Sequence, residues 1–364
     1  MIQPGALRAA HNPHGPHRPP QAGGTPVDTR AHHQNILVQV ERNGDAPRRF
    51  TFALLPNFTM MCFVCALETL RIANRVSGKE LFSWSIAGEG GESVTSSSGV
   101  SFDVDTDLEA VQRDETVLLC GGIDIQSSTS KKMLNWLRRE ARRGIKVGGL
   151  CTASYSLAKA GLLDGKRATI HWENADSFVE EFDEIELTKS VFVIDGDLMT
   201  TAGGTASIDL MLTLIAADYG EELANVVADQ LIYSTIRTDQ DSPRLSIPTR
   251  IGVRHPKLSK VVQIMEQNLE EPISPPILAK DVGLSTRQLE RLFRRYLSRS
   301  PKRYYMELRL QKARNLLMQT DMSVINVALA CGFSSPSHFS KCYRTQYQTT
   351  PYRERGAQAA RLSF

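Results

Sequence analysis

Hydrophobic and polar positions change their spacing along this chain, and the change separates two kinds of structure. Between residues 50 and 235, short apolar runs alternate with stretches of helical periodicity. Such alternation predicts βαβ units, that is, a mostly parallel sheet covered by helices on both faces. The apolar runs include 52–55, 116–119 and 145–147, and the helical stretches span 60–75, 130–143, 152–161 and 205–219.

Beyond residue 257 the strand pattern disappears and helical periodicity continues to about residue 355, which predicts an all-α C-terminal domain. The polar segment 236–256, which contains three prolines, is predicted to be the linker between the two domains. Residues 1–48 and 356–364 are predicted to be tails. The first tail holds five of the eight histidines, but irregular histidines in a Pro-rich segment are more typical of disorder than of a metal site. We therefore expect no metal and no cofactor.

The C-terminal domain contains a short apolar helix, a glycine turn at Gly283 and then a capped helix. Ser285 is an N-cap, and Gln288 three residues later completes a capping box. The second helix has an apolar inner face and a basic outer face, a combination that suits the major groove of DNA. The inner face is Leu289, Leu292, Phe293 and Leu297, and the outer face is Arg287, Arg291 and Arg294.

The same arrangement recurs about fifty residues later, with Gly332 at the turn, Ser335 as N-cap and Pro336 at the first helical position. An amphipathic helix around 306–317 connects the two units. Two recognition helices on a rigid spacer can enter successive major-groove faces about 34 Å apart. The inner face of the second unit is Phe339, Cys342, Tyr343 and Tyr347, and its outer face is Ser337, Lys341 and Arg344.

Charge supports this interpretation of the C-terminal domain. The whole chain carries a net charge of only +3, but residues 255–364 hold 18 basic and 8 acidic side chains, whereas residues 1–254 hold 25 and 32. An acidic body with a basic end favours a polyanionic partner for that end. The chain shows neither a signal peptide nor a membrane-spanning apolar run, and its six cysteines are scattered, which predicts a reduced, cytoplasmic protein.

The segment GFSSPSHFSKCYRTQYQTTPYRER, residues 332–355, resembles the signature of AraC/XylS-type regulators, and the resemblance extends over 257–355. Gln348 stands where a glycine is usual in that family. The resemblance implies base-facing positions at Arg287, Glu290 and Arg291 in the first unit and at Ser337, His338 and Lys341 in the second. Glu290 has two interpretations: an acceptor for cytosine N4, or an i, i+4 partner of Arg294.

The N-terminal domain contains a cysteine where a strand turns sharply into a helix, at Cys151. This is the geometry of a nucleophile elbow, and the nearby helix N-terminus would favour the thiolate. Gly121 and Gly122 end another strand, and His171 follows the cysteine by twenty residues. In an open α/β sheet such strand ends line one crevice, the usual ligand site.

Residues 50–235 resemble the ThiJ/PfpI branch of the class I glutamine amidotransferase-like superfamily, which implies a flavodoxin-like fold. The whole chain is similar to GlxA-type regulators. Hydrolytic relatives follow the cysteine with histidine, where this chain has Thr152. They also place a glutamate on the first helix, where this chain has Cys62, and Glu68 lies too far along. Cys151 and His171 are thus predicted to be vestigial and the chain not to be an enzyme.

The resemblance implies an amine or amino-acid-like effector such as a betaine, carnitine or arginine. Backbone amides at the glycines and after Cys151 would hold its carboxylate, and aromatic faces its cationic group. Core packing is the alternative for each aromatic, as burial is for Cys62 and Cys65 against redox chemistry. The predicted effector contacts are Phe58, Gly121, Gly122, Cys151, Thr152, Tyr155, His171 and Trp172.

Together these patterns predict a transcription regulator, an activator by resemblance, that binds double-stranded promoter DNA through Arg287, Glu290, Arg291, Arg294, Ser337, His338, Lys341 and Arg344. Its other expected partners are an effector, RNA polymerase and a second copy of the chain, with no membrane. Three alternatives remain at this point. They are a cysteine-dependent hydrolase or lyase with a DNA-binding tail, an N-terminal domain that serves only dimerisation, and a DNA-binding architectural protein.

Overall fold

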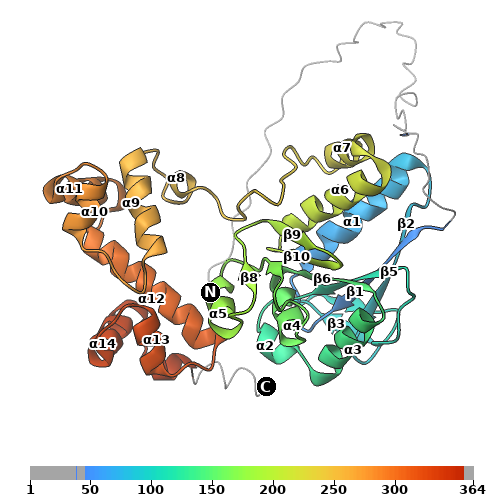
Figure 1. Ribbon diagram of the computed structural model, residues 1–364, viewed down its shortest axis with the longest axis horizontal. Helices are drawn as coiled ribbons and strands as arrows, with labels where there is room; N and C mark the ends of the chain where they lie inside the picture. Colours follow the sequence, from blue (N-terminus) through green and yellow to red (C-terminus); the bar gives the residue numbers. More distant parts are fainter. Residues whose placement is uncertain (1–37, 39–45, 356–364) are drawn as a thin grey trace, which may run out of the picture. The chain divides into compact units, whose positions relative to one another are not determined.

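The computed structural model describes residue 38 and residues 46–355, which form an α/β part followed by a helical part (Figure 1). The histidine-rich segment and the tail 356–364 lie outside the described residues.

A six-stranded sheet forms the centre of the α/β part. Its strands are parallel except for the last pair, in which β9 runs antiparallel to β10. The predicted parallel α/β architecture is thereby confirmed. In spatial order the strands are β2 (Phe82–Gly88), β1 (Arg48–Leu54), β5 (Glu115–Cys120), β6 (Lys146–Leu150), β10 (Leu198–Thr201) and β9 (Phe192–Asp195). Two small sheets join β3 (Ser93–Thr95) to β4 (Ser101–Asp103) and β7 (Arg167–Ala168) to β8 (Glu186–Leu187).

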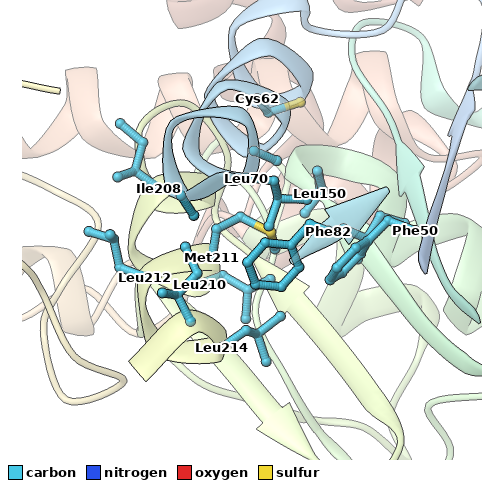
Figure 2. Packing of buried hydrophobic residues seen from close by; sticks show 14 of the residues in the cluster. Phe50, Cys62, Leu70, Phe82, Leu150, Ile208, Leu210, Met211, Leu212 and Leu214 are labelled. Carbon is cyan, nitrogen blue, oxygen red and sulfur yellow. The ribbon is translucent and has the colours of Figure 1, made fainter. Parts of the chain in front are cut away.

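Helices cover both faces of the main sheet, so strand residues are buried on alternate sides. Phe52 and Leu54 of β1 belong to one hydrophobic cluster, and Ala53 between them belongs to the other. Figure 2 shows the first cluster, where side chains of α1 and α6 meet Phe50 and Phe82 of the sheet. This face carries α1 (Met60–Ser77), α6 (Ala206–Tyr219) and α7 (Glu221–Gln230). The opposite face carries α2 (Ile125–Ser128), α3 (Lys131–Arg142), α4 (Ser154–Lys159) and α5 (Ala175–Glu181).

The carboxyl ends of four neighbouring strands lie level with one another. Leu54 pairs with Cys120, Cys120 with Leu150, and Leu150 with Thr201. The chain passes from β1 to β2 on one side and later returns to β5 on the other, so the order reverses between β1 and β5. Ligands of open α/β sheets bind outside the carboxyl ends of the strands at such a switch point. The residues that follow β1, β5, β6 and β10 are therefore the candidate ligand site of this fold.

The predicted linker, 236–256, is anchored at both ends. Its beginning is bonded to the α/β part, because Arg237 pairs with Asp209 of α6 and the Val191 amide donates to the Asp241 carbonyl at 2.9 Å. Its end contains a short helix, α8 (Ile247–Arg250), that packs on the helical part with help from an Arg250–Glu266 ion pair at 2.7 Å. Only residues 242–246 connect the two anchored stretches.

The helical part is built on two hydrophobic clusters that share one long helix, α12. Tyr305 of α12 lies in the first cluster, and Leu310 and Leu317 lie in the second. The predicted connecting helix at 306–317 is thus confirmed. The helices are α9 (Pro256–Gln267), α10 (Pro275–Asp281), α11 (Thr286–Leu297), α12 (Pro301–Gln319), α13 (Val324–Ala330) and α14 (Pro336–Tyr347). No helix within the described residues is long and apolar enough to cross a membrane.

Candidate DNA interface and effector site

The first recognition helix, α11, begins as the sequence predicts. The Gln288 amide donates to Ser285 Oγ at 3.2 Å, and the Ser285 amide donates to Gln288 Oε1 at 2.8 Å, which completes the capping box. Leu289 and Phe293 are fully buried. The opposite face is exposed and consists of Arg287, Glu290, Arg291 and Arg294.

The charges on this outer face have no partners within the part of the chain that the structure describes. Arg287, Arg291 and Arg294 form no ion pair there, and Glu290 does not bond to Arg294. The intrahelical interpretation of Glu290 therefore finds no support, and the side chain is free to approach a base. Exposed arginines without protein partners are available for guanine edges and for phosphates.

The second recognition helix, α14, repeats the plan with fewer charges. Ser335 Oγ accepts from the His338 amide at 3.3 Å, and Phe339 and Tyr343 are fully buried. The helix ends at Gln348, which adopts a left-handed φ of 56°, a conformation that glycine adopts most readily. Its exposed face holds Ser337, His338, Lys341 and Arg344.

One residue that supports the second unit was not predicted. Arg309 of α12 donates from Nε to the Cys331 carbonyl at 2.7 Å and from Nη2 to the Gly332 carbonyl at 2.5 Å, and its guanidinium lies 4.2 Å from the Phe333 ring centroid. Gly332 itself has φ 71°, and a Cβ there would lie 2.5 Å from the Glu270 carbonyl oxygen. The turn between α13 and α14 is therefore held by long-range contacts that helical periodicity does not reveal.

In the α/β part, the four level strand ends bring together the elbow cysteine and its neighbours. Cys151 follows β6 with a left-handed φ of 64° and opens the 3₁₀ turn Cys151–Ala153. Thr201, at the end of β10, accepts hydrogen bonds from the Cys151 amide at 3.4 Å and the Gly203 amide at 3.3 Å. Gly203 has φ 89°, and a Cβ on it would lie 2.7 Å from Cys151 Sγ. The elbow thus depends on a glycine that leaves space for the thiol.

The thiol of Cys151 is buried and only 5% of the residue is exposed. Thr59 Oγ1 lies 3.7 Å from its sulfur. Burial and the nearby Cys62 raise the pKa of Cys151 to about 12, although the Thr59 hydroxyl and the Thr152 amide act in the opposite direction. The expected thiolate is therefore wrong, because desolvation outweighs the hydrogen bonds that a strand-to-helix turn supplies.

Gly121 and Gly122 allow the loop after β5 to approach the elbow closely. A Cβ on Gly121 would lie 2.5 Å from the Ala153 amide nitrogen, and Thr152 Oγ1 donates to the Gly122 carbonyl at 2.7 Å. The Gly121 amide already donates to Leu150 at 3.2 Å, so it is not available to a ligand. The Gly122 amide donates to no group among the described residues.

His171 lies in the loop before α5, with 28% of its side chain exposed and Nδ1 3.9 Å from a Glu173 carboxylate oxygen. Burial lowers the pKa of His171, so the ring is neutral at pH 7. Within the described chain it makes no hydrogen bond to Cys151. Trp172 is 40% exposed, and the guanidinium carbon of Arg244 lies 4.3 Å from its ring centroid.

Two of the predicted effector contacts are placed differently. Phe58 is completely buried and packs edge-on against Phe63 and Phe102, so only its backbone, bridged to Gly122, belongs to the loop. Tyr155 lies in the cluster on the other face of the sheet from Cys151, and its hydroxyl donates to Glu181 at 3.0 Å. Both aromatics are core residues, as the alternative interpretation had it.

Sequence reasoning also missed residues around Cys151. Thr59 and Thr201 gave no recognisable signal, whereas the Gly203-Gly204 pair after a strand was a signal that went unused. Cys62 is fully buried, and its thiol donates to the Thr59 carbonyl at 2.9 Å, which agrees with a packing role. No cluster of three or more potential metal ligands occurs in the described part of the chain.

Comparison with known proteins gives the two parts a family. The DJ-1/PfpI family model matches residues 62–217, and a helix-turn-helix domain model matches residues 278–357. The transcriptional regulator GbdR of Pseudomonas aeruginosa is 43% identical over 312 residues, which cover 86% of this chain and 85% of the relative.

Two further relatives match over similar lengths. The regulator CdhR of the same organism is 44% identical over 306 residues, covering 84% of this chain and 91% of the relative. GlxA of Rhizobium meliloti is 37% identical over 306 residues, covering 84% and 94%. All three are named HTH-type transcriptional regulators. The chain therefore belongs to the family of DNA-binding transcriptional regulators that join a DJ-1/PfpI domain to an AraC-type helix-turn-helix domain.

Proposed function

We propose that this regulator is an activator that reads promoter DNA with α11 and α14 in response to a cationic, amino-acid-like effector. The observation that carries the DNA-binding assignment is the exposed arginine face of α11, which has no ion-pair partner among residues 46–355. The face on α14 has the same register and is less basic, so α11 contributes more of the affinity. Activation, with RNA polymerase as the further partner, is inferred from the AraC/XylS resemblance alone.

The effector is proposed to bind outside the carboxyl ends of β1, β5 and β6. The Gly122 amide, which donates to no other group in the described part of the chain, and the Thr152 region are suited to a carboxylate. The half-exposed Trp172 ring is suited to an ammonium or guanidinium group. Cys151 and His171 complete the lining that we propose for this region. Phe58 and Tyr155 are left out of the proposed contacts because their side chains are packed elsewhere in the core.

We further propose that the site binds its ligand without transforming it. The Cys151 thiol is protonated at neutral pH, and the groups that act on its pKa among the described residues are the Thr59 hydroxyl, the Thr152 amide, the Cys62 thiol and the charge of Glu173, which raises it further. His171 is neutral and its Nδ1 faces Glu173, so this ring does not take a proton from the Cys151 thiol. A hydrolase needs a thiolate and an oriented base, so these contacts support sensing over catalysis.

A DNA-binding protein of this family is expected in the cytoplasm, and we propose a homodimer.

The DNA-binding proposal is tested by fluorescence anisotropy. The probes are a duplex from the promoter region of the gene that encodes the chain and unrelated duplexes of equal length. Arg291→Ala should weaken binding to the promoter fragment. If Arg291 contacts a guanine, the difference in binding free energy between the promoter fragment and unrelated DNA should shrink by about 1–3 kcal/mol. Arg142→Ala is the matched control, since Arg142 is an exposed arginine on α3 of the α/β part. An equal loss of affinity for all duplexes would mean that Arg291 contacts only phosphate. No loss of affinity would mean that α11 does not contact the DNA.

The effector proposal is tested by thermal shift of the full chain with glycine betaine, carnitine, arginine and related amines. Stabilisation should grow with ligand concentration, as expected for binding to the folded state. Cys151→Ala should retain any ligand-dependent transcription. Failure of every cationic compound to stabilise the chain would exclude this effector class. Loss of the transcriptional response in Cys151→Ala, with the thermal stabilisation by the effector unchanged, would return catalysis to consideration.

A further inference from the structure

The exposed ring of Trp172 already carries a cation from the chain itself. The guanidinium carbon of Arg244 lies 4.3 Å from the ring centroid, well within the range of a cation–π contact. Within the described residues, Arg244 forms no ion pair and its side chain donates no hydrogen bond to another group. The aromatic ring is therefore the nearest partner of this charge among the described residues, while the Glu266 and Asp176 carboxylates attract it without forming an ion pair.

Arg244 stands on Trp172 because the start of the linker is held against the α/β part. Arg237 donates to the buried Asp209 carboxylate from Nε at 3.0 Å and from Nη2 at 2.6 Å. The Asp241 carbonyl accepts from the Val191 amide at 2.9 Å, only three residues before Arg244. Three residues span at most about 10 Å, so these anchors keep the guanidinium close to the ring. Arg244 lies within residues 242–246, the short connection between this anchored stretch and α8.

A cationic effector and Arg244 would need the same aromatic face. One face of the ring accommodates one cation, so the two are mutually exclusive on the face that Arg244 covers. We propose that Arg244 occupies the cation position of the effector site when the effector is absent, and that the effector binds by displacing it. Displacement frees residues 242–246, the stretch that leads to the DNA-binding part. This inference rests on the proposed effector class, and it adds the regulation of that site.

The size of the competition follows from the strength of the contact. A cation–π pair at an exposed site favours the occupied ring by about 2- to 5-fold over the free ring. The apparent effector affinity is reduced by the fraction of free ring, so removing Arg244 should tighten effector binding by about 3- to 6-fold.

Calorimetric titration of the full chain with glycine betaine, and with tetramethylammonium as a probe that carries only the cationic group, measures this effect. Arg244→Gln should bind both probes about 3- to 6-fold more tightly than the unmodified chain. Arg254→Gln is the matched control, because Arg254 is an exposed arginine ten residues further along, and it should leave both affinities unchanged. Trp172→Leu should weaken both probes by about tenfold and remove the advantage of Arg244→Gln in the double variant.

Trypsin supplies a second readout on the unmodified chain, because it cleaves after arginines that are accessible and mobile. Glycine betaine should accelerate cleavage after Arg244 several-fold while leaving cleavage after Arg254 nearly constant. Slower or unchanged cleavage after Arg244 in saturating betaine would overturn the displacement.

The outcomes separate the two proposals. If Trp172→Leu weakens binding but Arg244→Gln binds no more tightly than the unmodified chain, the displacement is wrong and the effector site stands. If Trp172→Leu leaves both affinities unchanged, the cation is bound elsewhere and the displacement is wrong again. If the unmodified chain binds neither probe, the effector class fails and the displacement fails with it.

Discussion

The buried carboxylate of Asp209 gives the most quantitative test of how the linker is held. It is completely buried in α6 and accepts hydrogen bonds from the Tyr233 hydroxyl at 2.9 Å, the Arg237 amide at 2.8 Å and the Arg237 guanidinium. Asp209→Asn keeps the shape of the side chain but removes its charge, and it turns an amide group towards these donors. Arg237 is left without its counter-charge.

Breaking a buried ion pair from one side costs about 3–5 kcal/mol. The Arg237 side chain is 26% exposed and can be hydrated in part, which places Asp209→Asn at the lower end, about 3 kcal/mol. Asp218→Asn is the matched control on the same helix. Asp218 also pairs with one arginine, Arg48, but its side chain is 34% exposed, so about 0–1 kcal/mol is expected.

Urea unfolding followed by tryptophan fluorescence measures both values on the right part of the chain. All three tryptophans, Trp84, Trp136 and Trp172, lie in the α/β part, so the signal reports its unfolding separately from the helical part. Asp209→Asn should also accelerate trypsin cleavage after Arg237. A difference of less than 1 kcal/mol between the two variants would refute the reasoning from burial.

Three further predictions concern the two sites. Gly203→Ala should destabilise the α/β part by about 2 kcal/mol and more than Gly204→Ala in the same urea assay, because φ is unfavourable at both but only Gly203 would place a Cβ 2.7 Å from Cys151 Sγ; equal costs would contradict this. Since the folded Cys151 thiol ionises only near a pKa of about 12, its alkylation by iodoacetamide, followed by peptide mass spectrometry, should keep rising to about pH 9.5; a plateau near neutral pH would indicate a thiolate. Glu290→Gln should strengthen binding to unrelated DNA, because a carboxylate is repelled by phosphate, and it should weaken discrimination between promoter and unrelated DNA by about 1–3 kcal/mol in competition anisotropy. Unchanged discrimination between the two DNAs would exclude a contact of Glu290 with a base.

Much of the fold was predictable because its signals are local. Helix periodicity and caps act within a few residues, so the expected helices at 130–143 and 205–219 correspond closely to α3 and α6. The capping box of Ser285 and Gln288 and three residues of the predicted inner face of α11, Leu289, Phe293 and Leu297, were correct for the same reason. A cap or a helix face depends on neighbours three or four residues away, and these are visible in the sequence.

The effector site was less predictable because a parallel sheet is buried on both faces. Its strands show no alternation that marks which side a following residue will face. Tyr155 was therefore assigned to the crevice, although it packs on the other face of the sheet from Cys151. The thiolate expectation failed because the burial of Cys151 involves groups far away in the sequence, such as Thr59, Cys62 and Gly203.

The sequence by itself determined the two helix-turn-helix units, their outer faces and the α/β class of the domain before them. Only the tertiary structure decided which groups meet across long separations: Thr201 and Gly203 at Cys151, Arg237 at Asp209, and Arg244 at Trp172. Periodicity encodes which face of an element is apolar, since that follows from local geometry. Pairing of side chains from distant elements follows from how the elements pack, and no local spacing records it.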